Sequence, residues 1–250
     1  MSNYQRNTSM VVCIFAVLII GAVVVGALSY YGTTNWNWNP VTTDYAFEAE
    51  VGATTGTVML DVDLAAGAVV VTFVDNATLL YDVDIRVDNT TLDRDGAPTV
   101  TFTSNVIRLD YTAAGVNVTL GSGLNYTIDI VASAGDADII LDEGAHVGDI
   151  SVQVTAGEIN FVMSDAVVLL GSPSFDLEST TGGIFIVVDL PPDVGGSIEC
   201  ATTVGGVDIT AAGWTEITSN HYETTDYGTA SQSITILAQT DVGEIDAVLT

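Results

Sequence analysis

The segment Ala156-Gly157-Glu158-Ile159-Asn160-Phe161 carries the fold signal, because its order of small residue, Gly, polar residue and alternating apolar residues recurs along the chain. The recurrences are residues 134–139, 147–152, 182–186, 195–200, 205–209 and 242–247. Successive marker glycines are 22, 26 and 23 residues apart, at Gly135, Gly157, Gly183 and Gly206. Coils of this length, with short strands each opened by a Gly that turns the chain, are typical of stacked repeats. The repeat predicts a β-solenoid or a related stacked-strand array, with inward Ile, Val and Phe in continuous ladders.

Upstream of the clearest repeats the chain is also rich in strand signals. Apolar and polar residues alternate in 58–64, 80–87 and 126–130. A period of two with abundant Val, Ile and Thr predicts strands with one face in water. We therefore expect a mainly β domain over residues 45–250, with the clearest repeats in 130–250. Whether 45–120 forms a separate β domain stays open at this point.

Turns rich in Ser and Thr precede two of the repeats, in residues 178–184 and 201–207. These units resemble the DUF4097-type adhesin-like domains, the toast-rack β-repeat domains of bacterial and archaeal envelopes. The resemblance covers roughly residues 120–250. It implies a surface-exposed β-helical module associated with adhesion, and it supplies no catalytic residues to carry over.

The N-terminal part of the chain reads as a membrane anchor. Residues 10–28 contain no charged side chain, and as a helix they would be roughly 28 Å long, close to the thickness of a bilayer core. Aromatic residues typical of the membrane interface follow, at Tyr30, Tyr31, Trp36 and Trp38. With Arg6 the only charge on the N-terminal flank, the positive-inside rule places the N-terminus in the cytoplasm. The sequence thus predicts a cytoplasmic segment 1–9, a single transmembrane helix 10–29, a stalk 30–44 and an extracellular domain 45–250.

Two other interpretations of the N-terminal segment stay open. Residues 25–27 and 27–29 resemble small-residue cleavage sites, so the segment is alternatively a cleaved signal peptide. A pilin-type leader is a further alternative, although the apolar stretch lacks an acidic residue near its start. With either an anchor or a signal peptide, the bulk of the chain lies outside the cell.

The acidity of the chain belongs almost wholly to its exported part. Beyond residue 31 there are 32 acidic residues against three Arg, a net charge of −29. This charge excludes a nucleic-acid binder, which needs a basic face to contact phosphates. The hydrophobic fraction of 48% excludes a disordered acidic tail, because the chain has ample apolar material to bury. We expect diffuse cation binding, no cofactor, and surroundings salty enough to screen the self-repulsion.

Four Asn-x-Thr sequons beyond the anchor agree with an outside location, although a chain this rich in Thr contains some by chance. They begin at Asn76, Asn89, Asn117 and Asn125, each a candidate glycosylation site. Cys13 falls in the predicted membrane helix and Cys200 far out in the exported part, so the two cannot pair. We expect Cys200 to point into the core as a small apolar residue.

Pairs of acidic residues are the main candidates for chemistry. The pairs Asp61/Asp63, Asp82/Asp84, Asp93/Asp95 and Asp136/Asp138 are in principle the carboxylates of a glycosidase or oxygen ligands of Ca²⁺. Residues i and i+2 on a strand share one face, so we expect these pairs to form a solvated surface instead. Neither a calcium-loop motif nor a Gly-x-Ser-x-Gly elbow occurs, and His146 and His221 are too few for a transition-metal site. The sequence therefore predicts no catalytic, cofactor-binding or metal site.

Residues 213–233 interrupt the repeat with aromatic and polar residues, Trp214, His221, Tyr222 and Tyr227 among them. We expect a loop or a terminal cap of the solenoid, and the alternative is an excursion that contacts a ligand.

The sequence as a whole predicts a membrane-anchored cell-surface β-repeat protein that acts as an adhesion or interaction module. The expected partner is a surface protein or a glycan, with self-association as a further possibility. The alternatives are a structural subunit of a surface layer or filament, or an envelope-sensing ectodomain. A β-helix enzyme that cleaves acidic glycans is a remote alternative, because the three exported Arg all lie outside the clear repeats.

Overall fold

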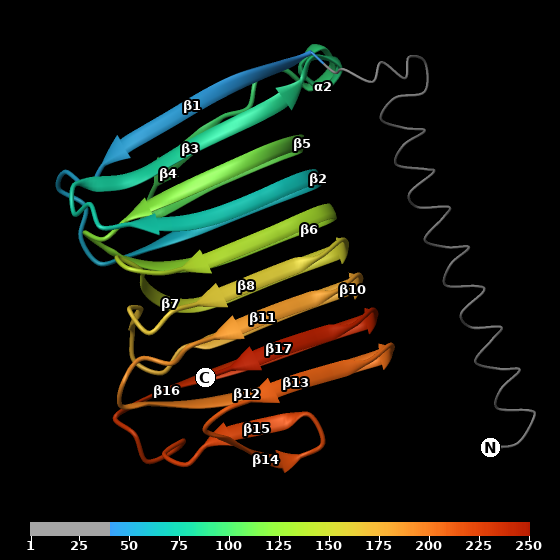
Figure 1. Cartoon of the computed structure of the whole chain (residues 1–250). Helices are drawn as coiled ribbons and strands as arrows, with labels where there is room; N and C mark the ends of the chain where they lie inside the picture. The colour runs from blue at the N-terminus through green and yellow to red at the C-terminus, as the bar shows by residue number, and fades with distance from the viewer. Residues whose placement is uncertain (1–40) are drawn as a thin grey trace, which may run out of the picture.

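The computed structural model describes residues 41–250, which form one continuous stack of β-strands (Figure 1). The predicted segments 1–9 and 10–29, together with Tyr30, Tyr31, Trp36 and Trp38, lie outside the described residues. Within residues 41–250, no helix has the length and apolar character needed to cross a membrane. The first strand begins at Thr42, so the folded domain takes in the last residues of the predicted stalk.

The described chain is mainly β, as predicted, with one short helix. The strands are β1 (Thr42–Glu50), β2 (Thr57–Val74), β3 (Leu79–Asp88), β4 (Val100–Thr103), β5 (Val106–Gly121), β6 (Asn125–Leu141), β7 (His146–Ala156), β8 (Ile159–Met163), β9 (Val168–Leu169), β10 (Ser174–Thr181), β11 (Ile184–Val188), β12 (Val194–Val204), β13 (Val207–Ala211), β14 (Trp214–Thr218), β15 (His221–Thr224), β16 (Gln232–Val242) and β17 (Ile245–Leu249). The helix α2 (Asn89–Asp95) lies beside β3, and the Asp88 side chain caps its start by accepting a hydrogen bond from Thr90 N.

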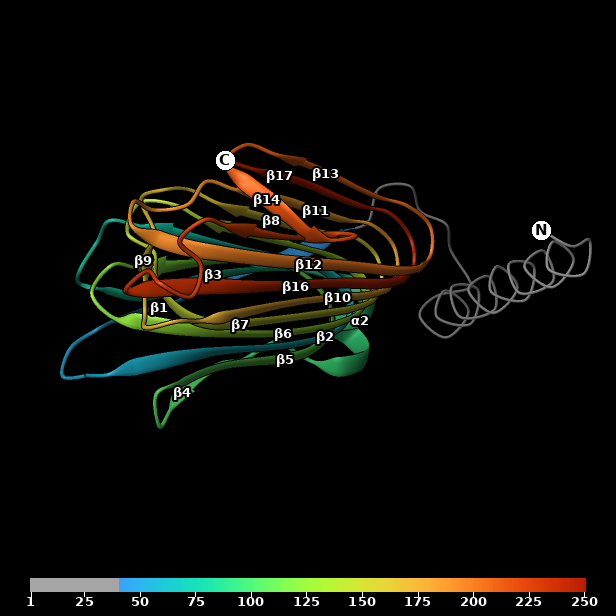
Figure 2. The ribbon, with the colours of Figure 1, turned by 90° about the horizontal axis from the view of Figure 1, so that it is seen from below.

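Each coil contributes one strand segment to each of two facing layers, seen edge-on in Figure 2. Layer A contains the first halves of β5, β2 and β6, then β7, β10, β16 and β12. Layer B contains β1, β3, the second halves of β5, β2 and β6, then β8, β11, β17 and β13. The strands of neighbouring coils pair in parallel, and antiparallel pairing occurs where β1, β3 and β4 close one end and β14 and β15 the other.

A column of glycines lets the coils turn from layer A into layer B. We call it the corner column: Ala114, Gly67, Gly135, Gly157, Gly182, Gly243 and Gly205, in the order of the stack. A Cβ atom on Gly157 would lie 1.8 Å from the carbonyl oxygen of Gly135, and one on Gly182 would lie 1.7 Å from that of Gly157. Both glycines also have a positive φ, of 149° and 144°, where a side chain is strained. In two coils the corner residue therefore differs from the glycine that marked the repeat in sequence. The corners are Gly182 and Gly205, each one residue before the marker glycines Gly183 and Gly206.

Two buried hydroxyl groups support the corner column from inside. The Ser179 hydroxyl donates a hydrogen bond to the carbonyl oxygen of Gly157 at 3.3 Å, and the Thr240 hydroxyl donates to that of Gly182 at 3.1 Å. Each bond joins a coil to its neighbour, and each satisfies a polar group that is shielded from water.

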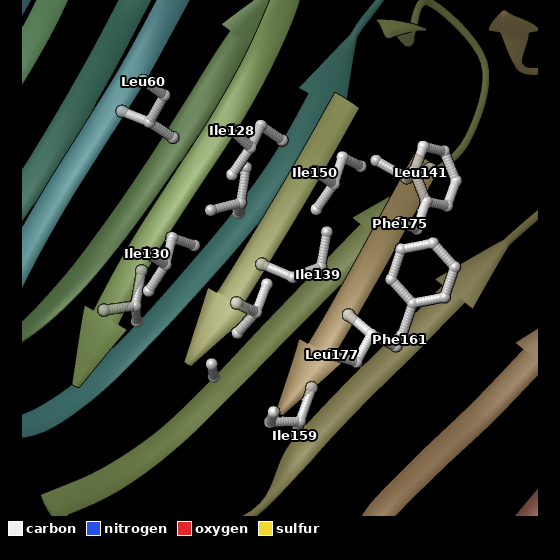
Figure 3. Packing of buried hydrophobic residues seen from close by; sticks show 14 of the residues in the cluster. Leu60, Ile128, Ile130, Ile139, Leu141, Ile150, Ile159, Phe161, Phe175 and Leu177 are labelled. Atoms are coloured by element: carbon white, nitrogen blue, oxygen red, sulfur yellow. The ribbon is translucent and has the colours of Figure 1, made fainter. Parts of the chain in front are cut away.

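The core fills the space between the two layers with apolar ladders (Figure 3). Ile150 is paired in register with Ile128 on one side and Phe175 on the other, and all three are buried. The rings of Phe161 in layer B and Phe175 in layer A meet with centroids 5.3 Å apart. One cluster of buried residues extends from Val58 to Leu249. Residues 45–120 are thus part of the same domain and not a separate one.

The order of the coils in space differs from their order in the chain. The β2 coil lies between β5 and β6, and the last coil, β16–β17, lies between β10–β11 and β12–β13. The β5 coil therefore ends the corner column, and there the chain has Ala114 where the inner coils have Gly. No strand pairs with residues 110–114 on the side away from β2, so a Cβ atom fits at this one corner.

The hairpin β14–β15 covers the end of the stack at β12, which confirms the terminal cap predicted for this interruption of the repeat. Trp214 is buried there against Gly196, where a Cβ atom would approach the indole ring to 2.3 Å. The aromatic side chain thus replaces a further coil over the end of the core.

Candidate binding face

The outer faces of the two layers are acidic, and their positive charges are confined to one end. The three Arg of the described residues lie on β3, α2 and β5 and pair with nearby carboxylates, as Arg86–Asp44 (2.8 Å), Arg94–Asp95 (2.6 Å) and Arg108–Asp61 (2.9 Å). The part of the stack from β6 to β13 carries only carboxylates as formal charges. His146 lies on β7 in this part, and His221 lies on the cap strand β15. Any ligand that approaches this part meets a negative surface.

One region of layer B departs from the acidic pattern. Ile140, Val162, Val187 and Val248 stand side by side in register on β6, β8, β11 and β17, all on the outer face. Phe185 lies two residues before Val187 on the same face, with 42% of its surface exposed. We call these five residues the Phe185 patch. Among the described residues the other exposed large apolar side chains, Val41, Val74, Val131, Val168 and Ile217, occur singly.

A hollow of about 200 Å³ adjoins the Phe185 patch. Its floor is Gly183, and its other lining side chains include Glu158, Asn160, Phe185, Glu244 and Asp246. We call this the Gly183 hollow. It exists because Gly183, unlike Gly182, is not needed for a turn: a Cβ atom there would meet its nearest neighbour at an ordinary 3.6 Å. The missing side chain leaves a gap between Glu158 and Glu244, which lie on either side of Gly183.

Hydrogen bonds between coils hold one wall of the Gly183 hollow in place. The Asn160 side-chain amide donates to Asp138 Oδ1 at 2.7 Å, and the Glu158 backbone N–H donates to Asp136 Oδ1 at 3.0 Å. The pair Asp136/Asp138 is therefore structural, since both carboxylates accept hydrogen bonds from the next coil. The Asn160 carbonyl oxygen is left directed away from that bond.

The other acidic pairs show no common catalytic arrangement. Asp61/Asp63 project from layer A and Asp82/Asp84 from layer B, as expected for strand residues that share one outer face. Asp93/Asp95 is different, because these residues lie on α2, where positions i and i+2 do not face each other. The expectation of a shared strand face was wrong for this pair. Among the described residues, no group of three or more His, Cys, Asp or Glu side chains is placed to hold a metal ion.

A second, larger hollow of about 320 Å³ lies on layer B near the β1 end. It forms over Ala68 and Gly115, and Arg86 and Asn117 contribute to its walls. Asn117 is one of the four sequon residues, and its side chain is exposed on β5.

The remaining sequon residues differ in exposure. Asn76 is exposed in the turn after β2, and its Oδ1 accepts hydrogen bonds from both the backbone N–H and the hydroxyl of Thr78. Asn89 is half-buried at the start of α2 and accepts a hydrogen bond from the Thr43 hydroxyl at 2.8 Å. Asn125 is half-buried at the start of β6. Asn76 and Asn117 are thus the two accessible acceptors in the folded chain.

The structure brings one Ser, one His and one Glu together where the cap strand β15 pairs with β12, a contact that the sequence did not indicate. Ser197 Oγ lies 3.2 Å from His221 Nε2, and Glu223 Oε1 lies 3.3 Å from the same nitrogen. A catalytic triad uses the two ring nitrogens separately, one for the nucleophile and one for the carboxylate. Because both contacts share Nε2, this cluster cannot relay a proton in that way. His146, on β7, is not part of it.

Two of the raised pKa values belong to the core residues Cys200 and Tyr126. Burial raises the pKa of the Cys200 thiol to about 12, with a further contribution from the Glu199 charge. Burial also raises the pKa of Tyr126 to about 12, and its hydroxyl donates a hydrogen bond to the Leu80 carbonyl oxygen at 2.8 Å. Cys200 is buried as predicted. Neither group supplies an anionic nucleophile at neutral pH.

No known family model matches the sequence, and no curated protein does. A solved structure with a similar fold is a "putative cell adhesion protein" of Clostridium sporogenes ATCC 15579, with a TM-score of 0.66 and 16% sequence identity. That match covers 84% of this chain and 100% of the other. At this identity the similarity establishes a shared fold.

Two further solved structures align over most of the chain. They are a "putative adhesin" of Bacteroides fragilis NCTC 9343 (TM-score 0.32, 13% identity, 84% of this chain and 97% of the other) and one of Parabacteroides merdae ATCC 43184 (TM-score 0.26, 9% identity, 85% and 97%). Their TM-scores are too low to support a structural argument.

Proposed function

We propose that this chain is a membrane-anchored cell-surface protein whose β-stack acts as an adhesion or interaction module of the DUF4097 type. The observation that carries the proposal is the Phe185 patch, an apolar surface on an otherwise acidic face. Contiguous exposed apolar surface on a soluble domain marks a place where another molecule binds. The fold shared with the Clostridium sporogenes protein supports the same class of function.

In this proposal residues 10–29 hold the chain in the membrane and the stack projects from it. The described chain enters at β1, and layer B continues through nine strands to β13 at the other end. At about 4.8 Å between strands the layer is about 38 Å long. The β14–β15 cap is then the end farther from the membrane, and the Phe185 patch lies in the half next to it.

We include glycosylation at Asn76 and Asn117 in the proposal, because these are the accessible sequon residues. Both lie in the half of the stack nearer to the proposed anchor. The Phe185 patch is free of sequons, so sugars at these positions would leave it open to a partner. The intact mass of the chain isolated from its own cells checks for the added sugars.

Attachment of cells tests the adhesion function. Cells that lose the chain should attach less to one another or to their natural substratum, and reintroducing the full chain should restore attachment. The matched negative control is the same chain with Gly182→Val, in which we expect the clash of the Val side chain with the Gly157 carbonyl oxygen to disrupt the fold while the predicted anchor is unchanged. Equal attachment with and without the folded chain would exclude adhesion.

The assembly alternative gives a different result in the same material. Vesicles that carry the full chain at high density would show an ordered lattice by electron cryo-microscopy if the chain were a layer or filament subunit. We expect no lattice, because neighbouring copies present like-charged faces to each other.

A further inference from the structure

We propose that the Phe185 patch and the Gly183 hollow together form a docking site for a basic protein segment, in which a Lys or Arg side chain of the partner enters the hollow beside an aliphatic residue that packs on the patch. This inference rests on the proposed binding function and names the partner's chemistry. The partner is identified by two complementary features, an apolar surface and positive charge.

The shape of the site suits one long side chain. Glu158, Gly183 and Glu244 come directly before β8, β11 and β17, and β8 and β17 lie on either side of β11, so the backbones of the two glutamates are about 10 Å apart with Gly183 between them. Phe185 stands at one end of the gap. The methylene groups of a Lys or Arg stem can pack on the Phe185 ring while the charged head lies between the two carboxylates.

The charge of the site selects a cation. Glu158, Glu244 and Asp246 line the hollow, and all three are exposed. Each described Arg pairs with a carboxylate on β1, α2 or β2, outside the hollow, so no Arg of the stack neutralises these carboxylates. The Asn160 carbonyl oxygen adds a neutral acceptor, because its amide nitrogen is held by Asp138. A positively charged donor gains from every one of these groups.

The apolar row separates this site from the rest of the acidic surface. Ile140, Val162, Val187 and Val248 extend over four adjacent strands, about 14 Å across. Polycations bind any acidic face through diffuse charge, but only a segment that also carries aliphatic residues can cover this row. The same acidic rim opposes a second copy of this chain, whose patch carries the same charge.

Binding of short peptides to the full chain in nanodiscs of neutral lipid tests the proposal. The probes are three capped hexapeptides: alternating Lys and Val, Lys alone, and alternating Glu and Val. We expect the Lys-Val peptide to bind roughly tenfold more tightly than hexalysine, because it adds the aliphatic contacts. The Glu-Val peptide should not bind, since it meets the carboxylates with like charge.

Two variants with matched controls locate the site. Gly183→Val fills the hollow and Phe185→Thr removes the ring, and each should weaken Lys-Val binding by roughly tenfold. Gly206→Val makes the same change directly before β13, where a Cβ atom meets nothing within 4 Å, and Val131→Thr removes an exposed apolar side chain from layer A. These controls should bind as the unaltered chain does.

Three outcomes would overturn the proposal: equal affinity for Lys-Val and hexalysine, no binding of Lys-Val, or equal binding by the Gly183→Val and Gly206→Val chains. Its failure is distinguishable from failure of the adhesion function. A Gly183→Val chain that still restores cell attachment contradicts the docking site alone. If every variant restores cell attachment, the Gly182→Val chain included, adhesion itself is contradicted.

Discussion

At the scale of single residues, two adjacent glycines have opposite roles. Gly182 turns the chain at a corner where its Cα approaches the backbone of the next coil, whereas Gly183 opens a hollow on the outer face. The sequence alone shows a Gly-Gly pair and does not tell which glycine forms the corner and which opens the hollow. The division follows from the backbone, since only Gly182 has a positive φ.

Substitution of the two glycines by Ala should therefore give different stabilities. Gly182→Ala forces a Cβ atom to within 1.7 Å of a carbonyl oxygen and places Ala at a φ of 144°, which should cost about 3 kcal/mol or more. Gly183→Ala should change stability by no more than about 1 kcal/mol, because the added methyl group is accommodated. Urea denaturation of both chains measures the difference, and equal midpoints would contradict the assignment of the corner.

At the scale of elements, the last two strands join parts of the stack that are distant in the chain. β16 pairs with β10 on one side and β12 on the other, and β17 pairs with β11 and β13. The coil β12–β13 therefore has no direct strand pairing with β10–β11. Until residues 232–250 are in place, the two halves of this end of the stack cannot join.

A chain that stops after Ser231 should lose order at the cap end only. We expect amide hydrogens of β12 and β15 to exchange about 100-fold faster or more, while those of β2 and β6 keep their protection. Hydrogen-exchange mass spectrometry measures both. Adding a synthetic peptide of residues 232–250 should restore protection of β12, as the control for the missing strands. Unchanged protection of β12 in the shortened chain would show that the β16–β17 coil is not needed to order β12.

At the scale of the whole molecule, the register of the stack brings like charges together. Asp63 lies opposite Asp110, and Asp208 lies opposite Asp246. Like charges at directly opposed positions destabilise a sheet by some tenths of a kcal/mol each. The carboxylates of adjacent strands are closer than the screening length of about 10 Å at 0.1 M salt, so the repulsion persists unless salt is high.

The melting temperature of the chain should therefore rise between about 0.01 M and 1 M NaCl, where the screening length falls from about 30 Å to about 3 Å. Asp208→Asn should reduce the size of this rise, because it removes one carboxylate from a facing pair. Asp165→Asn, in the exposed turn after β8, is the matched control and should leave the rise nearly unchanged. Differential scanning calorimetry measures the three curves. A melting temperature independent of salt would contradict the role given to the acidic faces.

The candidate site shows where prediction from the sequence stopped. The site residues that the sequence proposed were sequons and interface aromatics, and none of them belongs to the Phe185 patch. One signal was present, because residues 184–188 read Ile-Phe-Ile-Val-Val without the alternation of the other strands. Phe185 and Val187 stand at outward positions where most other repeats carry polar residues. The missing alternation in residues 184–188 does not show which strands lie beside them, nor whether those strands place apolar residues in register with Phe185 and Val187.

The sequence by itself determined the strands, their solvent-exposed faces and most of the corners. These follow from local physics: alternate side chains point to opposite faces of a strand, and a tight corner beside another backbone excludes a Cβ atom. Only the tertiary structure decided the order of the coils and the register between them, because both depend on pairing between residues that are tens of positions apart. That register aligned Ile140, Val162, Val187 and Val248 in one row and set Gly183 between two glutamates. Local periodicity in the sequence was thus enough to predict the type of fold, whereas the binding face depends on pairing between distant strands.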